Sequence, residues 1–236
     1  MTALDATAPQ RAPSAGPGHP DSSGAPSVAA VVPRMVPGLE AQLRAPDQVF
    51  TGHGALRRAH ASGAGWLWLM QGGGDPRPDA LERLLDARAL PGVAPATILC
   101  GLALEPGGRI AESGLPGLRA EHPGLVELVG HRALPLRHTT FSNCLIAAGC
   151  FTRHGLPDAR RAPYAASLWS ARALRMQTGY FVPASVVQLA TPAHRPGAVG
   201  SIAGALWMLA SGAWTRGETL RNVGRLLRRE STEGGP

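Results

Sequence analysis

The sequence has no lysine, so all 23 of its basic residues are arginine, and they exceed the 16 acidic residues to give a formal net charge of +7. Aromatic residues are scarce, at 5%. The arginines are spread along the chain without interleaved aromatic residues, a pattern that excludes a typical nucleic-acid surface, and we expect no nucleic-acid partner. The basic balance instead favours anionic partners such as nucleotide diphosphates or acidic lipid headgroups.

Cysteine is also sparse. The three cysteines, Cys100, Cys144 and Cys150, show neither CxxC nor His-Cys spacing, which argues against a structural zinc site. An odd, low number fits buried thiols in a reducing compartment. The N-terminus has no charged segment followed by an apolar run, so we expect no signal peptide and a cytoplasmic protein.

Composition divides the chain into three regions. Residues 1–26 are rich in Pro, Ala, Gly and Ser and have nothing to build a core, which predicts a disordered tail. Residues 27–190 carry alternating strand and helix patterns and are long enough for one α/β domain. Residues 191–236 are expected to form a helical C-terminal appendage.

The C-terminal region leaves its role open. Residues 196–215 contain no charged residue and place Gly200 and Gly204 at GxxxG spacing. They nearly reach the length of a bilayer span but are dominated by Ala, Gly and Ser. A helix packed on the domain, a membrane-interfacial or dimerising helix, and a true span are all compatible with this pattern. The arginine-rich segment that follows is amphipathic, so peripheral contact at the inner face of the cell membrane is an alternative to a purely cytoplasmic location.

The stretch 66–85 organises the domain. Residues 66–70 form a short apolar run with two tryptophans, which predicts a strand covered on both faces. Three glycines, Gly72 to Gly74, then predict a flexible turn. Residues 78–85 predict a helix with Pro78 in its first turn and Leu81, Leu84 and Leu85 on one face. Ligands of open α/β sheets bind at the carboxyl ends of such strands.

Other segments predict further elements. Residues 27–32 and 98–104 are apolar and β-branched enough to be strands, and residues 106–108 predict a turn. Residues 36–45 predict a helix with Leu39 and Leu43 four apart.

These segments carry a family resemblance. The run "WLWLM....DPRPDALERLL" and the closing "TGYFVPASVVQL" resemble glycosyltransferase family 2, the inverting transferases of the rhamnosyl- and galactofuranosyl-transferase type. The resemblance covers roughly 49–189 and implies a GT-A-like (Rossmann-like) mixed sheet flanked by helices. It implies sugar transfer from a nucleotide-sugar to an envelope polysaccharide or a lipid-linked acceptor.

The acidic positions of the family are replaced. In the family, consecutive aspartates after the central strand bind Mg²⁺ or Mn²⁺, which holds the donor diphosphate; here these positions are Gln71, Gly72 and Gly73. The resemblance therefore implies a donor-binding segment made of Gln71, Gly72, Gly73, Gly74 and Asp75, with no certain cofactor and no complete metal-ligand set.

The second catalytic element is replaced as well. The chain keeps "HGLPDAR" and Arg172, but the paired acids that include the family's general base fall at Ala166 and Ser167. Asp158 is the carboxylate that remains in this segment and is our catalytic candidate, although a structural turn is an equally ordinary role for it. The final histidine of the closing strand, sometimes a metal ligand, is Leu189.

The N-terminal half is expected to be shortened. The family's second strand ends in an aspartate that holds the base and ribose, and the residues after Leu43 leave no room for it. Gly72 to Gly74 could cradle a phosphate with backbone N–H groups at a helix N-terminus, or be a plain loop. Asp75 and Asp79 could be ligands, or partners of the helix start.

Two functions follow. The first is a glycosyltransferase family 2-like enzyme with impaired or metal-independent activity. The second is a catalytically inactive relative that acts as a binding or partner subunit for an active glycosyltransferase. Whether the chain is an enzyme stays open at this point, because the pattern of the family is present and its acids are replaced.

Overall fold

The computed structural model describes residues 25–111, 116–119, 122–158, 164–190 and 208–210. The predicted disordered tail therefore lies almost wholly outside the described residues. The same holds for the C-terminal appendage, of which only 208–210 are described, as helix. Among the described helices, none has both the length and the apolar character needed to cross a membrane.

The core of the fold is a mixed sheet of nine strands in the order β2-β1-β3-β8-β5-β9-β7-β6, with β4 paired to β9. Strand β1 is parallel to β2 and β3, and β5 is parallel to β9, whereas the other pairs are antiparallel. The strands are β1 (Val28–Val32), β2 (Gln48–Thr51), β3 (Trp66–Leu69), β4 (Asp75–Pro76), β5 (Ile98–Leu104), β6 (Gly117–Leu118), β7 (Leu134–His138), β8 (Cys144–Ala147) and β9 (Gly179–Gln188).

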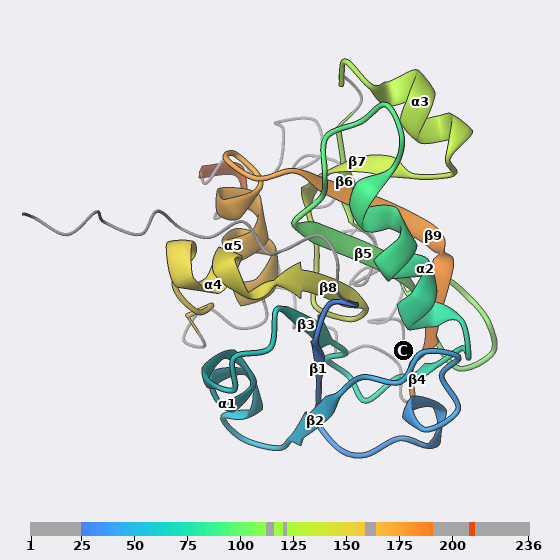
Figure 1. Cartoon of the computed structure of the whole chain (residues 1–236), viewed down its shortest axis with the longest axis vertical. Helices are drawn as coiled ribbons and strands as arrows, with labels where there is room; N and C mark the ends of the chain where they lie inside the picture. Colours follow the sequence, from blue (N-terminus) through green and yellow to red (C-terminus); the bar gives the residue numbers. More distant parts are fainter. Residues whose placement is uncertain (1–24, 112–115, 120–121, 159–163, 191–207, 211–236) are drawn as a thin grey trace, which may run out of the picture.

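Helices cover both faces of the sheet, which confirms the predicted α/β class. Helices α1, α4 and α5 lie on one side of the sheet in Figure 1, and α2 and α3 lie on the other. The bounds are η1 (Pro37–Leu39), α1 (Ala55–Ala61), α2 (Ala80–Asp86), η2 (Ala87–Ala89), α3 (Leu125–Gly130), α4 (Ala148–His154) and α5 (Ala165–Ala173).

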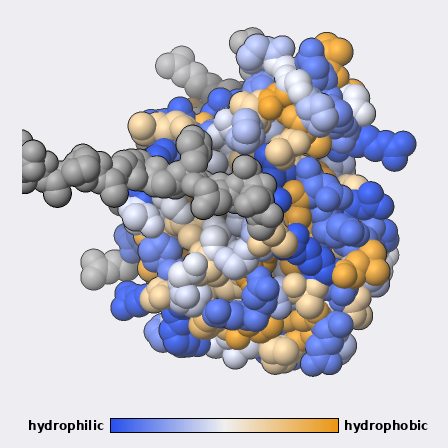
Figure 2. Space-filling view, in the orientation of Figure 1, coloured by the Kyte–Doolittle hydropathy of each residue, from blue (hydrophilic) through white to orange (hydrophobic). Residues whose placement is uncertain are grey.

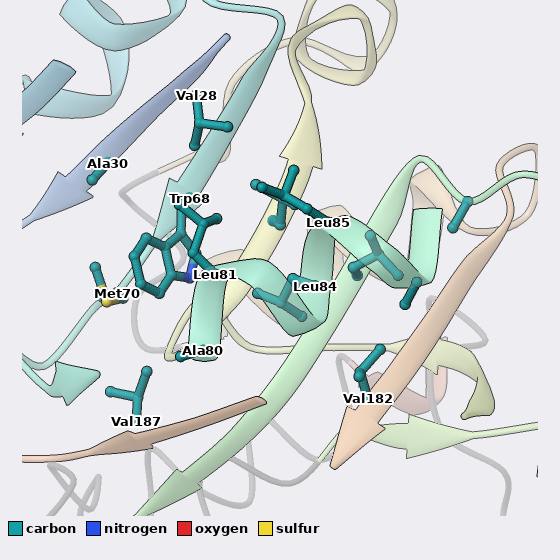
Figure 3. Packing of buried hydrophobic residues seen from close by; sticks show 14 of the residues in the cluster. Val28, Ala30, Trp68, Met70, Ala80, Leu81, Leu84, Leu85, Val182 and Val187 are labelled. Atoms are coloured by element: carbon teal, nitrogen blue, oxygen red, sulfur yellow. The ribbon is translucent and has the colours of Figure 1, made fainter. Parts of the chain in front are cut away.

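Strand β3 is buried on both faces, as its composition predicts. Trp68 packs with α2 in one apolar cluster, while Leu67 and Leu69 belong to the cluster beneath α1, α4 and α5. Leu81 and Leu84 of α2 are fully buried against the first cluster (Figure 3). Burial of a leucine side chain contributes about 1.5–3 kcal/mol, so this helix face holds α2 on the sheet. The predicted helix face is confirmed. However, α2 begins at Ala80, so Pro78 precedes the helix and does not lie in its first turn as predicted.

The helix predicted over 36–45 is wrong. Only η1 forms there, and the side chain of Leu43 is 71% exposed. The chain turns away because Leu43 donates its amide proton to the carbonyl oxygen of Pro78 at 2.7 Å, a contact with a distant segment that an α-helix would not allow. Tertiary contacts override the local periodicity here.

The prediction that the N-terminal half has no room for a second strand is also wrong. Strand β2 pairs in parallel with β1, with Ala29 opposite Gln48 and Val32 opposite Thr51. The connection from β1 to β2 is short enough because it contains η1 and an extended loop in place of a full helix. Strand β2 ends at Thr51 and is followed by glycine, so no aspartate stands at its carboxyl end.

A buried polar network joins the middle of the sheet to α2. The Asn143 side chain accepts a hydrogen bond from the Trp68 indole at 3.0 Å and donates to the Ser185 hydroxyl at 3.1 Å. Ser185 in turn donates to the Ala80 carbonyl oxygen at 2.8 Å. The register between β5 and β9 shifts at Gly101, where a bulge in β9 admits Ser185. Buried polar groups of this kind are stabilising only when each partner is present.

Replacement of Gly101 should test this packing. A Cβ atom on Gly101 would lie 2.1 Å from the Asn143 side-chain nitrogen and 2.6 Å from the Ser185 carbonyl oxygen. We expect Gly101→Ala to lower the free energy of unfolding by about 1–3 kcal/mol, measured by urea denaturation. Gly149→Ala is the matched control, because its Cβ would meet nothing within 4 Å. A Gly101→Ala protein as stable as the control would contradict the network.

Candidate functional site

The order in which the chain adds strands to the sheet reverses between β1 and β3, whose carboxyl ends lie side by side. The chain runs from β1 to β2 on one side of β1 and then returns to β3 on its other side. In open α/β sheets, ligands bind outside the carboxyl ends of the strands at such a switch point. Arg34 follows β1 at this edge, and the glycine turn follows β3.

The glycine turn has a backbone that side chains would disfavour. Gly72 and Gly73 have φ angles of 98° and 63°, a region that L-residues rarely occupy. Gln71 is exposed and holds the start of the turn, because its amide donates to the Phe141 carbonyl oxygen at 2.8 Å. Gly74 is buried against Val187 of β9, where a Cβ would lie only 2.2 Å from the Val187 side chain. The turn is therefore anchored at both of its ends.

Arg34 lies directly beside this turn. The position of a Cβ on Gly73 is 3.7 Å from Nε of Arg34, and Arg34 is exposed to solvent. Within the described part of the chain, the amide of Gly72, which is exposed, has no protein acceptor, whereas Gly73 is buried behind it. An arginine fork beside a free, exposed amide in a left-handed turn is a chemistry that recognises phosphate oxygens.

Asp75 has a structural partner. It lies in β4 rather than near the helix start, and its carboxylate accepts the amide proton of Gly38 in η1 at 2.7 Å. Asp79 makes no cap hydrogen bond and instead pairs with Arg83 at 3.1 Å. Asp75 is therefore not a partner of the helix start, whereas Asp79 stands at the N-cap position of α2 but makes no side-chain cap hydrogen bond.

The glycine turn does not sit at a helix N-terminus either. Strand β4 separates it from α2, so the helix start cannot add its amides to the turn. The N-terminus of α2 is satisfied by Gln42, whose side-chain oxygen accepts the amide proton of Leu81 at 3.2 Å. The Gln42 amide group donates to the carbonyl oxygens of Gly38 and Arg77 at 2.7 and 2.8 Å. Sequence reasoning missed Gln42, and no local signal identifies a cap that comes from a separate segment.

Leu189 packs against the glycine turn. A Cβ on Gly72 would lie 3.5 Å from Cδ2 of Leu189, and Leu189 is buried. The position where the resemblance places a histidine therefore lies beside the positions where it places the aspartates. None of the residues at these positions supplies a carboxylate or an imidazole.

The second predicted site lies around α5. Asp158 is exposed and, with Trp169 and Arg172, lines an open pocket of about 420 Å³. Ala166 and Ser167, where the resemblance places the paired acids, are buried within α5. Among the residues that line this pocket, Asp158 is the one with a carboxylate. Its position is compatible with the catalytic role that the sequence suggests for it.

Phe141 contacts both the glycine turn and the pocket along α5. The rings of Phe141 and Trp169 pack edge to face with centroids 5.7 Å apart, while the Phe141 carbonyl oxygen holds Gln71. His154 also packs edge-on against Trp169, at 6.4 Å. Burial lowers the pKa of His154, and the charges of Arg153 and Arg172 lower it further.

The described residues contain no cluster of three or more His, Cys, Asp or Glu side chains that could hold a metal ion. Comparison of the sequence with protein-family models and with curated proteins found no match. The site must therefore be interpreted from its own geometry.

Removal of the Gln42 cap should destabilise the platform beneath the turn. Gln42→Ala removes the side-chain partner of the Leu81 amide and of the buried Gly38 carbonyl oxygen, and we expect a loss of about 2–3 kcal/mol in the free energy of unfolding. Gln48→Ala, at an exposed position of β2, is the control and should change it by less than about 0.5 kcal/mol. Equal stability of the two variants in urea denaturation would refute the role of Gln42.

Proposed function

We propose that this chain is a glycosyltransferase family 2-like domain of GT-A type that binds a nucleotide-sugar without a metal ion. The observation that carries the proposal is the position of Arg34 beside the glycine turn, at the switch point of β1 and β3. This is where an α/β sheet of this kind holds its ligand. The diphosphate would lie over the glycine turn, with its charge neutralised by the guanidinium group rather than by Mg²⁺ or Mn²⁺.

The neutral residues support a metal-independent site. Gln71, Gly72 and Leu189 occupy the positions at which the resemblance places metal ligands, and none of them can supply a carboxylate or imidazole. The proposed donor site therefore depends on Arg34 and on backbone amides. Arginine suits this role because its planar fork matches two phosphate oxygens at once.

The proposed acceptor side is the pocket along α5. Trp169, which lines this pocket, packs on Phe141, whose carbonyl oxygen accepts the amide proton of Gln71, and this chain of contacts supports the proposal. The acceptor would be an envelope polysaccharide or a lipid-linked sugar. General-base catalysis requires a carboxylate within hydrogen-bond reach of the nucleophile. Asp158 is the carboxylate that lines the pocket, so transfer at this site would depend on it.

A second candidate function is that of a non-catalytic partner subunit for an active glycosyltransferase. Burial of Ala166 and Ser167 inside α5 favours it, because no side chain at these positions can take a proton from an acceptor. Contact with a membrane surface belongs to the same proposal. The face drawn in Figure 2 shows hydrophobic residues scattered among hydrophilic ones, and so gives this contact no separate support.

Direct binding separates the two functions. We expect calorimetric titration with UDP-, GDP- and dTDP-sugars to show binding of at least one donor at a micromolar dissociation constant, unchanged by EDTA or by added Mn²⁺. The affinity is independent of metal because the donor set contains no cation ligand. Absence of binding to all three donors would leave the partner-subunit function. Binding that EDTA abolishes would contradict the metal-free site.

Arg34 should carry much of the donor affinity. Arg34→Gln removes a charge-assisted contact, and we expect the dissociation constant of the bound donor to rise about 10- to 100-fold. Arg153→Gln is the matched control, because Arg153 lies on α4, which begins beside Gly65 at the opposite end of β3. Equal affinities of the two variants would show that the diphosphate does not bind at Arg34.

A further inference from the structure

Cys100 and Cys144 stand directly opposite each other on neighbouring antiparallel strands. Cys100 of β5 pairs with Cys144 of β8 in the middle of the sheet. The amide of Gly101 donates to the carbonyl oxygen of Asn143 at 2.8 Å. This bond makes the two cysteines a non-hydrogen-bonded pair, the kind in which opposite Cα atoms approach to about 4.5 Å.

The side chains of this pair meet. Both cysteines belong to the apolar cluster beneath α4 and α5, and both are free thiols. Burial, together with the neighbouring Cys100 thiol, raises the pKa of Cys144 well above its usual range. A Cα separation of about 4.5 Å lies within the range of disulfides, at its short end.

The Cys144 thiol also contacts the loop of Thr140 and Phe141, which anchors the glycine turn. The Cys144 thiol donates to the Thr140 carbonyl oxygen at 2.7 Å. The next residue, Phe141, accepts the amide proton of Gln71. A change at the Cys144 sulfur therefore reaches the proposed donor site through two consecutive residues of one loop.

We propose that Cys100 and Cys144 form a reversible cross-strand disulfide when the protein meets a hydroperoxide. The sulfur of one thiol attacks the peroxide O–O bond, which gives a sulfenic acid and releases one molecule of water or alcohol. The second thiol then attacks the sulfenic sulfur, the S–S bond forms, and the hydroxyl group leaves as water with the remaining proton. The two thiols are oxidised by two electrons and the peroxide is reduced.

Burial sets the rate of this step. The exposed fractions of Cys100 and Cys144 are 1% and 0%, so the oxidant reaches them only when the sheet opens locally. The reaction is expected to be slow, over minutes to hours, and to be selective for this pair. Cys150 is the internal control, because it is also buried but its thiol contacts the Thr97 carbonyl oxygen at 3.8 Å rather than a second cysteine.

The experiment treats the reduced full-length protein with hydrogen peroxide, blocks the remaining thiols and maps the peptides without reduction. We expect loss of two hydrogen atoms, one Cys100–Cys144 cross-link, an alkylated Cys150, and full reversal by dithiothreitol. Cys150→Ser should keep the cross-link, and both Cys100→Ser and Cys144→Ser should abolish it. Three alkylated cysteines, cross-links to Cys150, or sulfinic acid at Cys100 or Cys144 without a cross-link would overturn the proposal.

A second measurement rests on the proposed function. The disulfide removes the hydrogen bond from Cys144 to Thr140, so the oxidised protein should bind the nucleotide-sugar about fivefold more weakly than the reduced protein. The two proposals fail separately. A reduced protein that binds no donor contradicts the proposed function, whereas the disulfide is judged by mass alone. Equal donor affinity of the two redox forms would overturn the coupling.

Discussion

Burial of β3 on both faces is the constraint on which the rest of the structure depends. Leu67 and Leu69 face one helical layer and Trp68 faces the other, so the strand cannot slip by one residue without exposing its apolar set. The hydrogen bond from Trp68 to Asn143 ties the strand to β8. The place at which β3 ends, and hence the position of the glycine turn, follows from this packing.

The chemistry of the site follows from what stands at that strand end. A carboxylate there would repel a diphosphate unless a cation intervened, whereas the exposed Gly72 has no side chain to keep the proposed phosphate from the backbone. Arg34 is brought to the same point by the parallel pairing of β1 with β3. A proposed donor site without metal is thus consistent with the neutral residues Gln71, Gly72 and Gly73 at the positions where the resemblance places aspartates, because an acid there would be unfavourable beside the diphosphate.

Much of the fold could be predicted from the sequence, because its central elements are strongly patterned. The strand 98–104 and the leucine face of α2 are as predicted, since continuous apolar runs and helical spacing reflect burial directly. Strand β2 was missed because it is a short edge strand with mostly exposed residues. Gln42 and Asn143 were missed because their partners lie 39 and 75 residues away, and no local pattern encodes such contacts.

The most direct test of a metal-free diphosphate site at the end of β3 is an NMR titration of ¹⁵N-labelled protein with UDP, GDP and dTDP in the presence of EDTA. Binding at the proposed site predicts that the amide resonances of Gly72 and Gly73, and the Arg34 side chain, shift together with saturation. Shifts confined to the pocket at Trp169, or no shift with any of the three nucleotides, would contradict the account.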